Sequence, residues 1–490
     1  MGIVSDVSKR LPAGQLYIGG KWRDASDGAT AVIQNPSTEE TLGTLSLATA
    51  SDADAAVKAA RAQFDGGEWS RLSGADRGRL LWRVADLIEA NRENLAYLEA
   101  VDIGRPYAEP YNFEIPLAAD TFRHFAGWAD KITGQTFDLP TFAGRPRHSF
   151  TLRRPLGVVA AITPWNAPTM IASWKLATAL AAGNTLVIKP AELASLSTIR
   201  LVQLIEEAGI PGGVVNLLTG TGAIVGDALV RHEGVDKISF TGSPEVGRRI
   251  AAIGAQALKK VTLELGGKSP QIVRADADLD LVAAVAPVSF FANQGQTCAS
   301  GSRLLVHASI ADELSERLVA AARSIVVGDP FADDTQMGSL VSMGQLDRVA
   351  SYVDAGRREG ARLLIGGARL SRPGYFFPPT IFSGTNDMTI AREEIFGPVG
   401  TIIPVPDDEE ALRIANDTHY GLTSVVWTRD LSAAHTFAER IRSGSVWINA
   451  WGPPHPALPW LGVKTSGLGE ELGRAGLLAN TVEKTVSIVG

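Results

Sequence analysis

The sequence predicts an α/β fold in which a parallel sheet is covered by helices on both faces. Short apolar runs rich in Val and Ile alternate with longer helical patterns between residues 157 and 266, which is typical of βαβ units. Residues 268–475 mix strand and helix patterns again, which indicates a second α/β domain. With 490 residues, of which 45% are hydrophobic, the chain is long enough for two or three domains.

The elements of residues 157–266 alternate between strand and helix. The run "GVVAAI" predicts a strand, and the pattern after it predicts a helix from Pro168 to about Ala182 that Gly183 ends in a left-handed conformation. The alternation then continues through further pairs and a closing strand: "TLVIKP" with "SLSTIRLVQLIEEAG", "GVVNLLTG" with "AIVGDALVRH", "KISFTG" with "PEVGRRIAAIG", and "KKVTLELGG".

The regions around this array have other patterns. The first 130 residues contain helical patterns such as "RGRLLWRVADLIEANRENLAYLEAVD", whose apolar spacing suits packing on a core. The segment "FDLPTFAGRPRHSFTLRRP" alternates β-forming and charged residues. It therefore predicts a hairpin that projects from the body.

Composition and charge exclude several classes of protein. A net charge of −7 without runs of like charge argues against nucleic-acid binding. One cysteine cannot form an internal disulfide, and the seven histidines lack ligand spacing, so we expect no bound metal. The most apolar stretch is broken by Pro164, Pro168 and Lys175, which argues against a membrane span. We expect a cytoplasmic protein whose partners are small molecules or copies of itself.

Two glycine-containing turns follow strands of the predicted parallel sheet. "GTGAIVG" contains Gly222 and Gly226, and "FTGSPEVG" contains Gly242 and Gly247. A glycine turn that opens a helix lets phosphate oxygens approach backbone N–H groups at the positive end of the helix dipole. Either turn taken singly could be only a tight turn, but their succession in a βαβ array favours a dinucleotide site.

Cys298 stands in "FFANQGQTCASGSR", among residues that form loops. A lone cysteine is often a small buried hydrophobic residue. Here the Gly, Gln, Thr and Ser neighbours predict a turn with backbone amides beside the thiol. Since a thiol has an ordinary pKa of about 8.5 and is a strong nucleophile, Cys298 is the candidate nucleophile.

Several motifs, in order along the chain, resemble those of the NAD(P)-dependent aldehyde dehydrogenases. They are "TPWNAP", "KPAE", "FTGSPEVG", "LELGGKSP", "FFANQGQTCASGSR", "EEIFGPV" and "KTSGLGEELG", within a resemblance from "YIGGKW" to "EKTV". The resemblance implies a Rossmann-like NAD-binding domain of residues 1–131 and 155–267 and a catalytic domain of residues 268–475. It also implies oligomerisation segments at 132–154 and 476–490, in a homo-oligomer that is more readily a tetramer than a dimer.

The resemblance implies a role for five catalytic residues. Cys298 would be the nucleophile, Asn166 an oxyanion donor with the Cys298 amide, and Glu264 the base that activates water. Lys175 and Glu471 resemble a proton-relay pair. The alternatives from the residues themselves are a turn residue for Asn166, a solvated strand-end carboxylate for Glu264, and surface or helix-end charges for the pair.

The resemblance also implies a cofactor site. The matched residues are Ile162, Thr163, Pro164, Trp165, Lys189, Glu192, Gly222, Gly226, Phe240, Gly242, Ser243, Leu265, Glu394 and Phe396. Lys189 and Glu192 would hold the adenosine ribose, and Glu394 with Phe396 the nicotinamide ribose. A carboxylate on ribose hydroxyls repels the extra phosphate of NADP, so NAD is the predicted cofactor. Lys189 leaves the use of NADP open.

The expected substrate tunnel has aromatic and proline walls with few charges. Its predicted residues are Ala167, Met170, Trp174, Phe291, Thr297, Trp451, Pro453 and Leu458. Such walls favour an apolar aldehyde, aromatic or medium-chain, over a carboxylate-bearing semialdehyde, which would want an arginine clamp. Ala167 stands where the family often has a bulky aromatic residue, so we expect a wider tunnel.

Other readings of the family resemblance stay open. The substrate could be a semialdehyde or an amino-aldehyde, and coenzyme A acylation is a further alternative that Glu264 argues against. A non-enzymatic binding role would be expected to lose Cys298, Glu264 or Asn166, and all three are present. The family motif differs here at Trp460, Leu461 and Glu470, which weakens any inherited detail about subunit contacts there.

Overall fold

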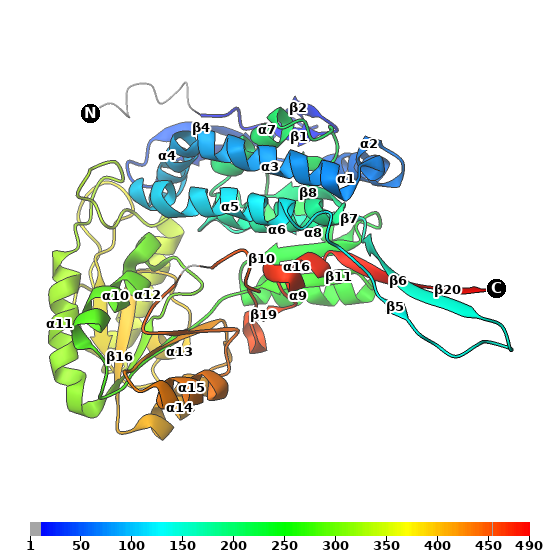
Figure 1. Cartoon of the computed structure of the whole chain (residues 1–490). Coiled ribbons are helices and arrows are strands. Elements are labelled where there is room, and N and C mark those ends of the chain that lie inside the picture. Colours follow the sequence, from blue (N-terminus) through cyan, green and yellow to red (C-terminus); the bar gives the residue numbers. More distant parts are fainter. Residues whose placement is uncertain (1–10, 453) are drawn as a thin grey trace.

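The computed structural model describes residues 11–452 and 454–490. Figure 1 shows two α/β bodies side by side and a thin β arm that projects from one of them. The position of Pro453, one of the predicted tunnel residues, lies outside the described residues.

The first body contains an eight-stranded sheet with the order β19-β11-β10-β7-β8-β9-β1-β2. The strands from β11 to β9 are parallel, and β1, β2 and β19 are antiparallel additions at its ends. The bounds are β1 Leu16–Ile18, β2 Lys21–Arg23, β7 Val158–Ile162, β8 Thr185–Lys189, β9 Val215–Leu217, β10 Lys237–Thr241, β11 Lys260–Glu264 and β19 Gly467–Leu468.

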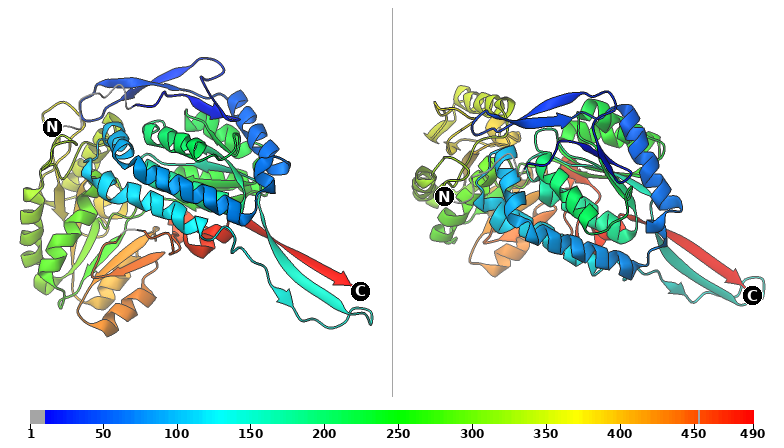
Figure 2. Two further views of the ribbon diagram at one scale, coloured as in Figure 1. Left: turned by 45° about the horizontal axis from the view of Figure 1, so that its top comes forward. Right: turned by 90° about the horizontal axis from the view of Figure 1, so that it is seen from above.

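Helices cover both faces of this sheet (Figures 1 and 2). They are α1 Ala50–Asp65, α2 Glu68–Arg71, α3 Gly74–Ala90, α4 Arg92–Ile103, α5 Ile115–Ala126, α6 Pro168–Ala182, α7 Leu196–Glu207, α8 Asp227–Arg231, α9 Pro244–Gln256 and α16 Gly473–Leu478. Helix α6 is buried along its whole length because α3, α5 and α7 pack around it. Its all-round apolar sequence is typical of such a central helix.

The second body is a seven-stranded sheet with the order β14-β15-β16-β13-β12-β17-β18, in which only the pairing of β14 is antiparallel. Its strands are β12 Pro270–Val273, β13 Arg303–His307, β14 Arg362–Ile365, β15 Thr380–Ser383, β16 Val399–Val405, β17 Thr423–Trp427 and β18 Ser445–Ile448. Its helices are α10 Leu279–Phe291, α11 Ala311–Ser324, α12 Met343–Arg358, α13 Thr389–Arg392, α14 Asp408–Asn416 and α15 Leu431–Arg440.

Two small sheets complete the fold. The arm joins β5 (Thr136–Phe137), β6 (Arg147–Pro155) and the C-terminal β20 (Thr481–Val489), and β20 pairs with β6 along its whole length. Strands β3 (Thr30–Gln34) and β4 (Thr41–Ser46) form a separate hairpin.

The predicted boundary between 267 and 268 falls between the last long strand of one sheet, β11, and the first strand of the other, β12. One segment differs from the predicted division. Residues 467–468, placed in the catalytic domain, form β19 and pair with β11 of the first sheet. A two-residue strand has no local sequence signal, so only the tertiary pairing shows where it belongs.

The parallel register brings the carboxyl ends of the strands to one edge of the first sheet. Ile162 pairs with Lys189, Phe240 pairs with Ile162, and Thr241 pairs with Glu264. In open α/β sheets ligands bind at this edge. The second body faces the same edge and contributes the loop that contains Cys298.

Candidate active site

Two cavities meet at Cys298. The first has a volume of about 400 Å³ and the second about 590 Å³. Five residues line both cavities: Asn166, Thr241, Glu264, Leu265 and Cys298. The structure thus brings together the three residues predicted for nucleophile, oxyanion donor and base, from the loop after α10, the loop before α6 and the end of β11.

Cys298 lies on a turn, as its neighbours predicted, and its thiol is free and partly buried. Burial, followed by the negative charges of Glu394 and Glu264, raises the pKa of Cys298 to about 12. The thiol therefore holds its proton at neutral pH in this arrangement. Attack on a carbonyl requires that a base remove the proton or that positive charge develop nearby.

Asn166 is buried directly before α6, and its side-chain amide donates to the Gln296 carbonyl at 3.0 Å. An amide nitrogen carries two N–H donors, so one remains for another acceptor. Asn166 lines both cavities, as Cys298 does, so its position is compatible with the predicted role of oxyanion donor.

Glu264 ends β11 and is only 3% exposed, so it is not a solvated strand-end carboxylate. Neither carboxylate oxygen has a hydrogen-bond partner among the described residues. Burial, and then the negative charge of Glu471, raise the pKa of Glu264 well above its ordinary range. A carboxylate in such a setting is a stronger base once it is ionised.

Lys175 and Glu471 form a buried ion pair, so neither is a surface charge. The Ser239 hydroxyl lies between them, 3.0 Å from Lys175 Nζ and 2.9 Å from Glu471 Oε1. Both charges influence the pKa of Glu264. The structure therefore brings the predicted relay pair next to the predicted base.

The first cavity contains most of the predicted tunnel residues: Ala167, Met170, Trp174, Thr297 and Trp451. Two others lie elsewhere. Phe291 is buried in the core of the second body against Phe290, and Leu458 is 63% exposed and does not line the cavity. Leu458 lies in a proline-rich loop, where the sequence cannot indicate which way a side chain points.

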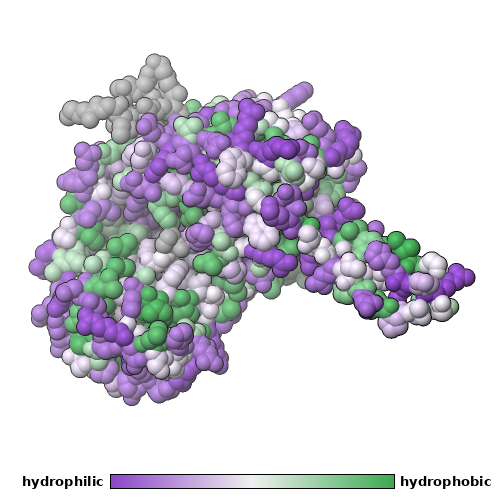
Figure 3. Space-filling view, in the orientation of Figure 1, coloured by the Kyte–Doolittle hydropathy of each residue, from purple (hydrophilic) through white to green (hydrophobic). Residues whose placement is uncertain are grey.

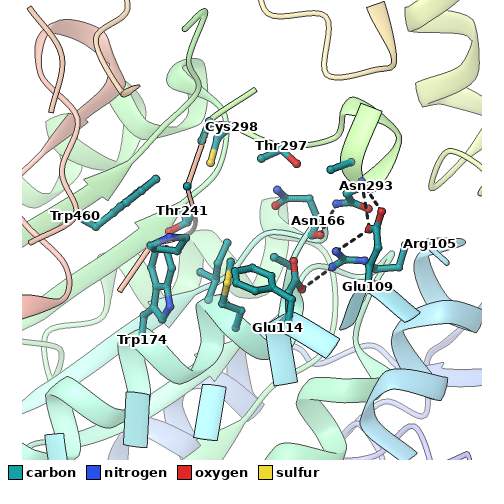
Figure 4. A pocket seen from close by; sticks show the side chains of 18 of the residues that line it. Arg105, Glu109, Glu114, Asn166, Trp174, Thr241, Asn293, Thr297, Cys298 and Trp460 are labelled. Carbon is teal, nitrogen blue, oxygen red and sulfur yellow. Dashed lines mark hydrogen bonds and ion pairs between the residues drawn. The ribbon is translucent and has the colours of Figure 1, made fainter. Parts of the chain in front are cut away.

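A charged cluster that the sequence did not predict lies in the wall of the first cavity. Arg105 pairs there with Glu109 and Glu114 (Figure 4). It also pairs with Glu99, which does not line the cavity. The expectation of a wall with few charges is therefore wrong on this side. Arg105 and Glu109 are four residues apart, a spacing that suggests an ion pair, but nothing local indicates that they face the cavity.

Trp460 also lines the first cavity, although it was not among the predicted tunnel residues. Its ring lies 5.8 Å from that of Trp174 and 6.4 Å from that of Trp447. Its backbone pairs with Glu471 in both directions. The departure from the family motif at Trp460 thus changes the cavity wall.

The second cavity contains half of the predicted cofactor residues: Pro164, Trp165, Gly242, Ser243, Leu265, Glu394 and Phe396. Ile162, Thr163 and Phe240 are buried at the adjacent strand ends and do not line it. A separate group forms at the end of β8, where Lys189 Nζ lies 3.5 Å from Glu192 and the Gly226 backbone lies beside the Lys189 stem. Gly222 is in the same turn as Gly226.

Three features of the second cavity suit a dinucleotide. Ser243 caps helix α9, whose positive N-terminal end opens into the cavity. The Gly267 N–H donates to Glu394 at 3.0 Å, and burial raises the pKa of Glu394 to about 7. A Cβ at Gly266 would lie 2.2 Å from the Glu394 carboxylate, so only glycine leaves that carboxylate room.

The model of the aldehyde dehydrogenase family matches residues 22–486. The chain belongs to the aldehyde dehydrogenase family. The predicted family and the predicted enzyme class, an oxidoreductase that acts on aldehydes, are therefore confirmed.

Relatives in this family match nearly the whole chain. The mitochondrial aldehyde dehydrogenase of Mesocricetus auratus is 45% identical over 477 residues, which are 97% of this chain and 95% of that protein. The betaine aldehyde dehydrogenase of Bacillus subtilis (strain 168) is 44% identical over 476 residues, which are 96% of each chain. The NAD+ complex of the Bacillus cereus aldehyde dehydrogenase has a TM-score of 0.96 at 41% identity and covers 99% of this chain and 98% of that chain. The predicted fold class is confirmed by this likeness.

No group of side chains among the described residues could hold a metal ion. Within the same residues, none of the helices has the length and apolar character needed to cross a membrane.

Proposed function

We propose that this aldehyde dehydrogenase oxidises an apolar aldehyde to the free carboxylic acid with NAD, through a covalent bond to Cys298. The observation that carries the proposal is the meeting of the two cavities at Cys298, Asn166 and Glu264. One cavity can hold the aldehyde and the other the cofactor, with the three reactive side chains between them.

The Cys298 sulfur would add to the aldehyde carbon, and the carbonyl oxygen would become an oxyanion. The Asn166 amide and the Cys298 backbone N–H are the donors that stabilise it. Because burial raises the pKa of Cys298, its proton must pass to a base as the bond forms. Solvent takes this proton, so the Glu264 carboxylate, which lines both cavities beside Cys298, stays free for the later step.

Residues of the second cavity, among them Glu394 and Phe396, would hold NAD, which would supply the hydride acceptor. Loss of hydride from the tetrahedral carbon would leave a thioester on Cys298. Glu264 would then take a proton from water, and the water oxygen would add to the thioester carbon. The C–S bond would break, which releases the acid and leaves Cys298 as a thiolate. The ion pair of Lys175 and Glu471 lies where it can carry the proton away from Glu264. The presence of Glu264 supports hydrolysis over transfer of the acyl group to coenzyme A.

The first cavity supports an aromatic or medium-chain aldehyde. Ala167, Met170 and Trp174 give it apolar walls beside Cys298. Arg105 is the only arginine among the described residues that line it, and three glutamate side chains already occupy its guanidinium group. A semialdehyde would therefore find no free arginine for its carboxylate.

A second candidate is an amino-aldehyde. Glu109 and Glu114 line the first cavity, so carboxylates outnumber the single guanidinium group on that wall. A cationic end group could interact with this excess of acidic groups. One relative of this chain is named betaine aldehyde dehydrogenase, which supports this second candidate.

The predicted NAD cofactor is supported by family membership and by the Bacillus cereus structure in its NAD+ complex. Lys189 and Glu192 lie together at the end of β8, as a ribose site would require. A carboxylate at that position favours NAD over NADP.

We also propose a homo-oligomer, more readily a tetramer, assembled through the arm. The arm projects from the body and exposes apolar residues along its strands (Figure 3), among them Phe142, Val482 and Ile488. Strands β5 and β20 are its free edges. Exposed edges of this kind usually pair with another chain.

Light scattering of wild type and of the Val482→Asp/Ile488→Asp variant tests the proposed oligomer. The variant is expected to have a smaller particle mass than wild type, and an unchanged mass would contradict assembly through the arm.

The substrate proposal is tested by NADH or NADPH formation with benzaldehyde, hexanal, betaine aldehyde and succinic semialdehyde, each with NAD, NADP or NAD plus coenzyme A. The highest kcat/KM is expected for the first two aldehydes with NAD, and the product should be the free acid. Preference for betaine aldehyde would favour the second candidate. Preference for the semialdehyde, or an acyl-coenzyme A product, would contradict the proposal.

A further inference from the structure

The loop before Cys298 has a backbone that is unfavourable for its own residues. Asn293 has φ 49° and ψ 37°, and Gln294 has φ 56° and ψ 30°. Gly295 follows with φ 68°. The left-handed region suits glycine, is tolerated by asparagine and is strained for glutamine. Contacts from other elements therefore help this loop to keep its conformation.

Glu109 and Asn166 supply contacts to Asn293. The Asn293 backbone N–H lies 3.3 and 3.2 Å from the two carboxylate oxygens of Glu109. Its side-chain amide donates to the Asn166 carbonyl at 2.7 Å and to the Gln296 carbonyl at 3.2 Å. The Asn166 side chain donates to the same Gln296 carbonyl at 3.0 Å. Asn293 thus links Glu109 to the residue that carries the oxyanion donor.

Arg105 holds Glu109 in place and reaches α6 as well. Its guanidinium group, only 4% exposed, lies 3.1 Å from Glu109, 2.5 Å from Glu114 and 3.4 Å from Glu99. Glu99 accepts the backbone N–H of Thr169 at 3.1 Å, in the first turn of α6. A planar guanidinium group can fix several carboxylates at once in defined directions. One cation therefore ties the start of α6, just after Asn166, to the loop that leads to Cys298 (Figure 4).

We propose that Arg105 and Glu109 are positioning residues that hold Asn293, and through it the Asn166 amide and the Cys298 loop, in the geometry needed for aldehyde addition. This inference rests on the proposed roles of Cys298 and Asn166. Arg105 and Glu109 act through hydrogen bonds to protein groups, so their effect should not depend on the charge of the aldehyde.

Two variants test the proposal: Glu109→Gln, which removes the charge at nearly constant size, and Arg105→Lys, which keeps the charge but removes the planar fork. Glu313→Gln is the matched control, because it removes one carboxylate from the exposed pair with Arg317 on α11. Cys298 is the only cysteine, so alkylation by iodoacetamide reports on the active-site thiol alone. Single-turnover NADH formation, KM for NAD and thermal unfolding complete the measurements.

In both variants we expect the single-turnover rate with a neutral aldehyde to fall about tenfold to a hundredfold, because a misplacement of reacting groups by about 1 Å can cost a hundredfold in rate. The rate of Cys298 alkylation should fall together with the single-turnover rate, whereas KM for NAD should stay close to the wild-type value. Glu313→Gln should behave as wild type. These readouts separate positioning from a general loss of stability, which would not selectively change the reactivity of one thiol in folded protein.

Wild-type rates and wild-type alkylation in both variants would overturn the proposal. A loss confined to cationic aldehydes would overturn it as well, because Glu109 would then bind the substrate directly. If Glu109→Gln does not fold, Arg105→Lys decides by the same criteria. Failure of the proposed function itself would look different, because wild-type protein would then be inactive or Cys298→Ala would remain active.

Discussion

Lys175 and Glu471 form an ion pair in the interior of the first body, and the Ser239 hydroxyl is hydrogen bonded to both. Lys175 comes from α6, and Glu471 precedes α16, nearly three hundred residues later. Both charges are removed from water, so each one needs the opposite charge of the other to offset the cost of its burial. The pair is therefore expected to support the fold, in addition to the proton-relay role proposed for it near Glu264.

Replacing Lys175 by Met should destabilise the protein strongly. The substitution leaves the Glu471 carboxylate buried without its cation, and removal of one member of a buried pair typically costs about 3–5 kcal/mol. The double variant Lys175→Met/Glu471→Leu should be more stable than Lys175→Met. Urea unfolding of the three proteins measures this. Equal stability of Lys175→Met and wild type would show that the pair does not support the fold.

Glu264→Gln should separate the two halves of the reaction. Hydride transfer does not need the base that activates water, so a burst of NADH is expected, followed by turnover that is slower by about 10²–10⁴-fold. In wild type the steady-state rate should rise with pH through the raised pKa of Glu264, because only the ionised carboxylate accepts a proton. That rise should be lost in the variant. A variant without a burst, or with normal turnover, would contradict this role.

Ala167→Phe should narrow the first cavity. Ala167 is buried in the cavity wall beside Asn166, and a ring at this position would occupy the space of an aromatic substrate. Overpacking of this size typically costs 1–3 kcal/mol, so kcat/KM for benzaldehyde should fall by about tenfold or more. The value for acetaldehyde should change little. Comparison of the two substrates checks the prediction, and an equal loss for both would instead indicate a displaced Asn166.

Glu99 should make stability depend on pH. Burial, and then the negative charge of Glu114, raise the pKa of Glu99 from 4.5 to about 8. Between these values the folded protein keeps a proton that the unfolded chain releases, so this group makes stability fall as pH rises. Glu99→Gln removes that dependence. Urea unfolding at pH 5 and pH 8 should show the variant gaining on wild type at the higher pH, and a constant difference would exclude the effect.

Local signals in the sequence were sufficient for the central helix. Pro168 in the first turn and Gly183 after the last turn mark both ends of α6, and Gly183 has the expected left-handed φ of 93°. The strands around it were equally visible, because β-branched runs between helices have few alternatives. The motif residues Cys298, Asn166 and Glu264 also come together, although their chemical roles stay predictions.

Long-range contacts explain what the sequence could not reveal. Arg105 makes its ion pairs locally, but Glu109 reaches Asn293 across 184 positions. No spacing rule covers such a contact. The strand at residues 467–468 is likewise defined only by its partner β11. Leu458 was assigned to the tunnel by its apolar character, yet it points to solvent, because a proline-rich loop has no regular alternation of faces.

The most direct test is to mix wild-type protein with one equivalent of benzaldehyde and excess NAD, and to follow NADH and intact protein mass together. Wild type should form NADH with brief appearance of an acyl adduct, the adduct should accumulate on Cys298 in Glu264→Gln, and Cys298→Ala should form neither. NADH formation by Cys298→Ala, or an adduct on another residue, would show that the reaction does not pass through this thiol.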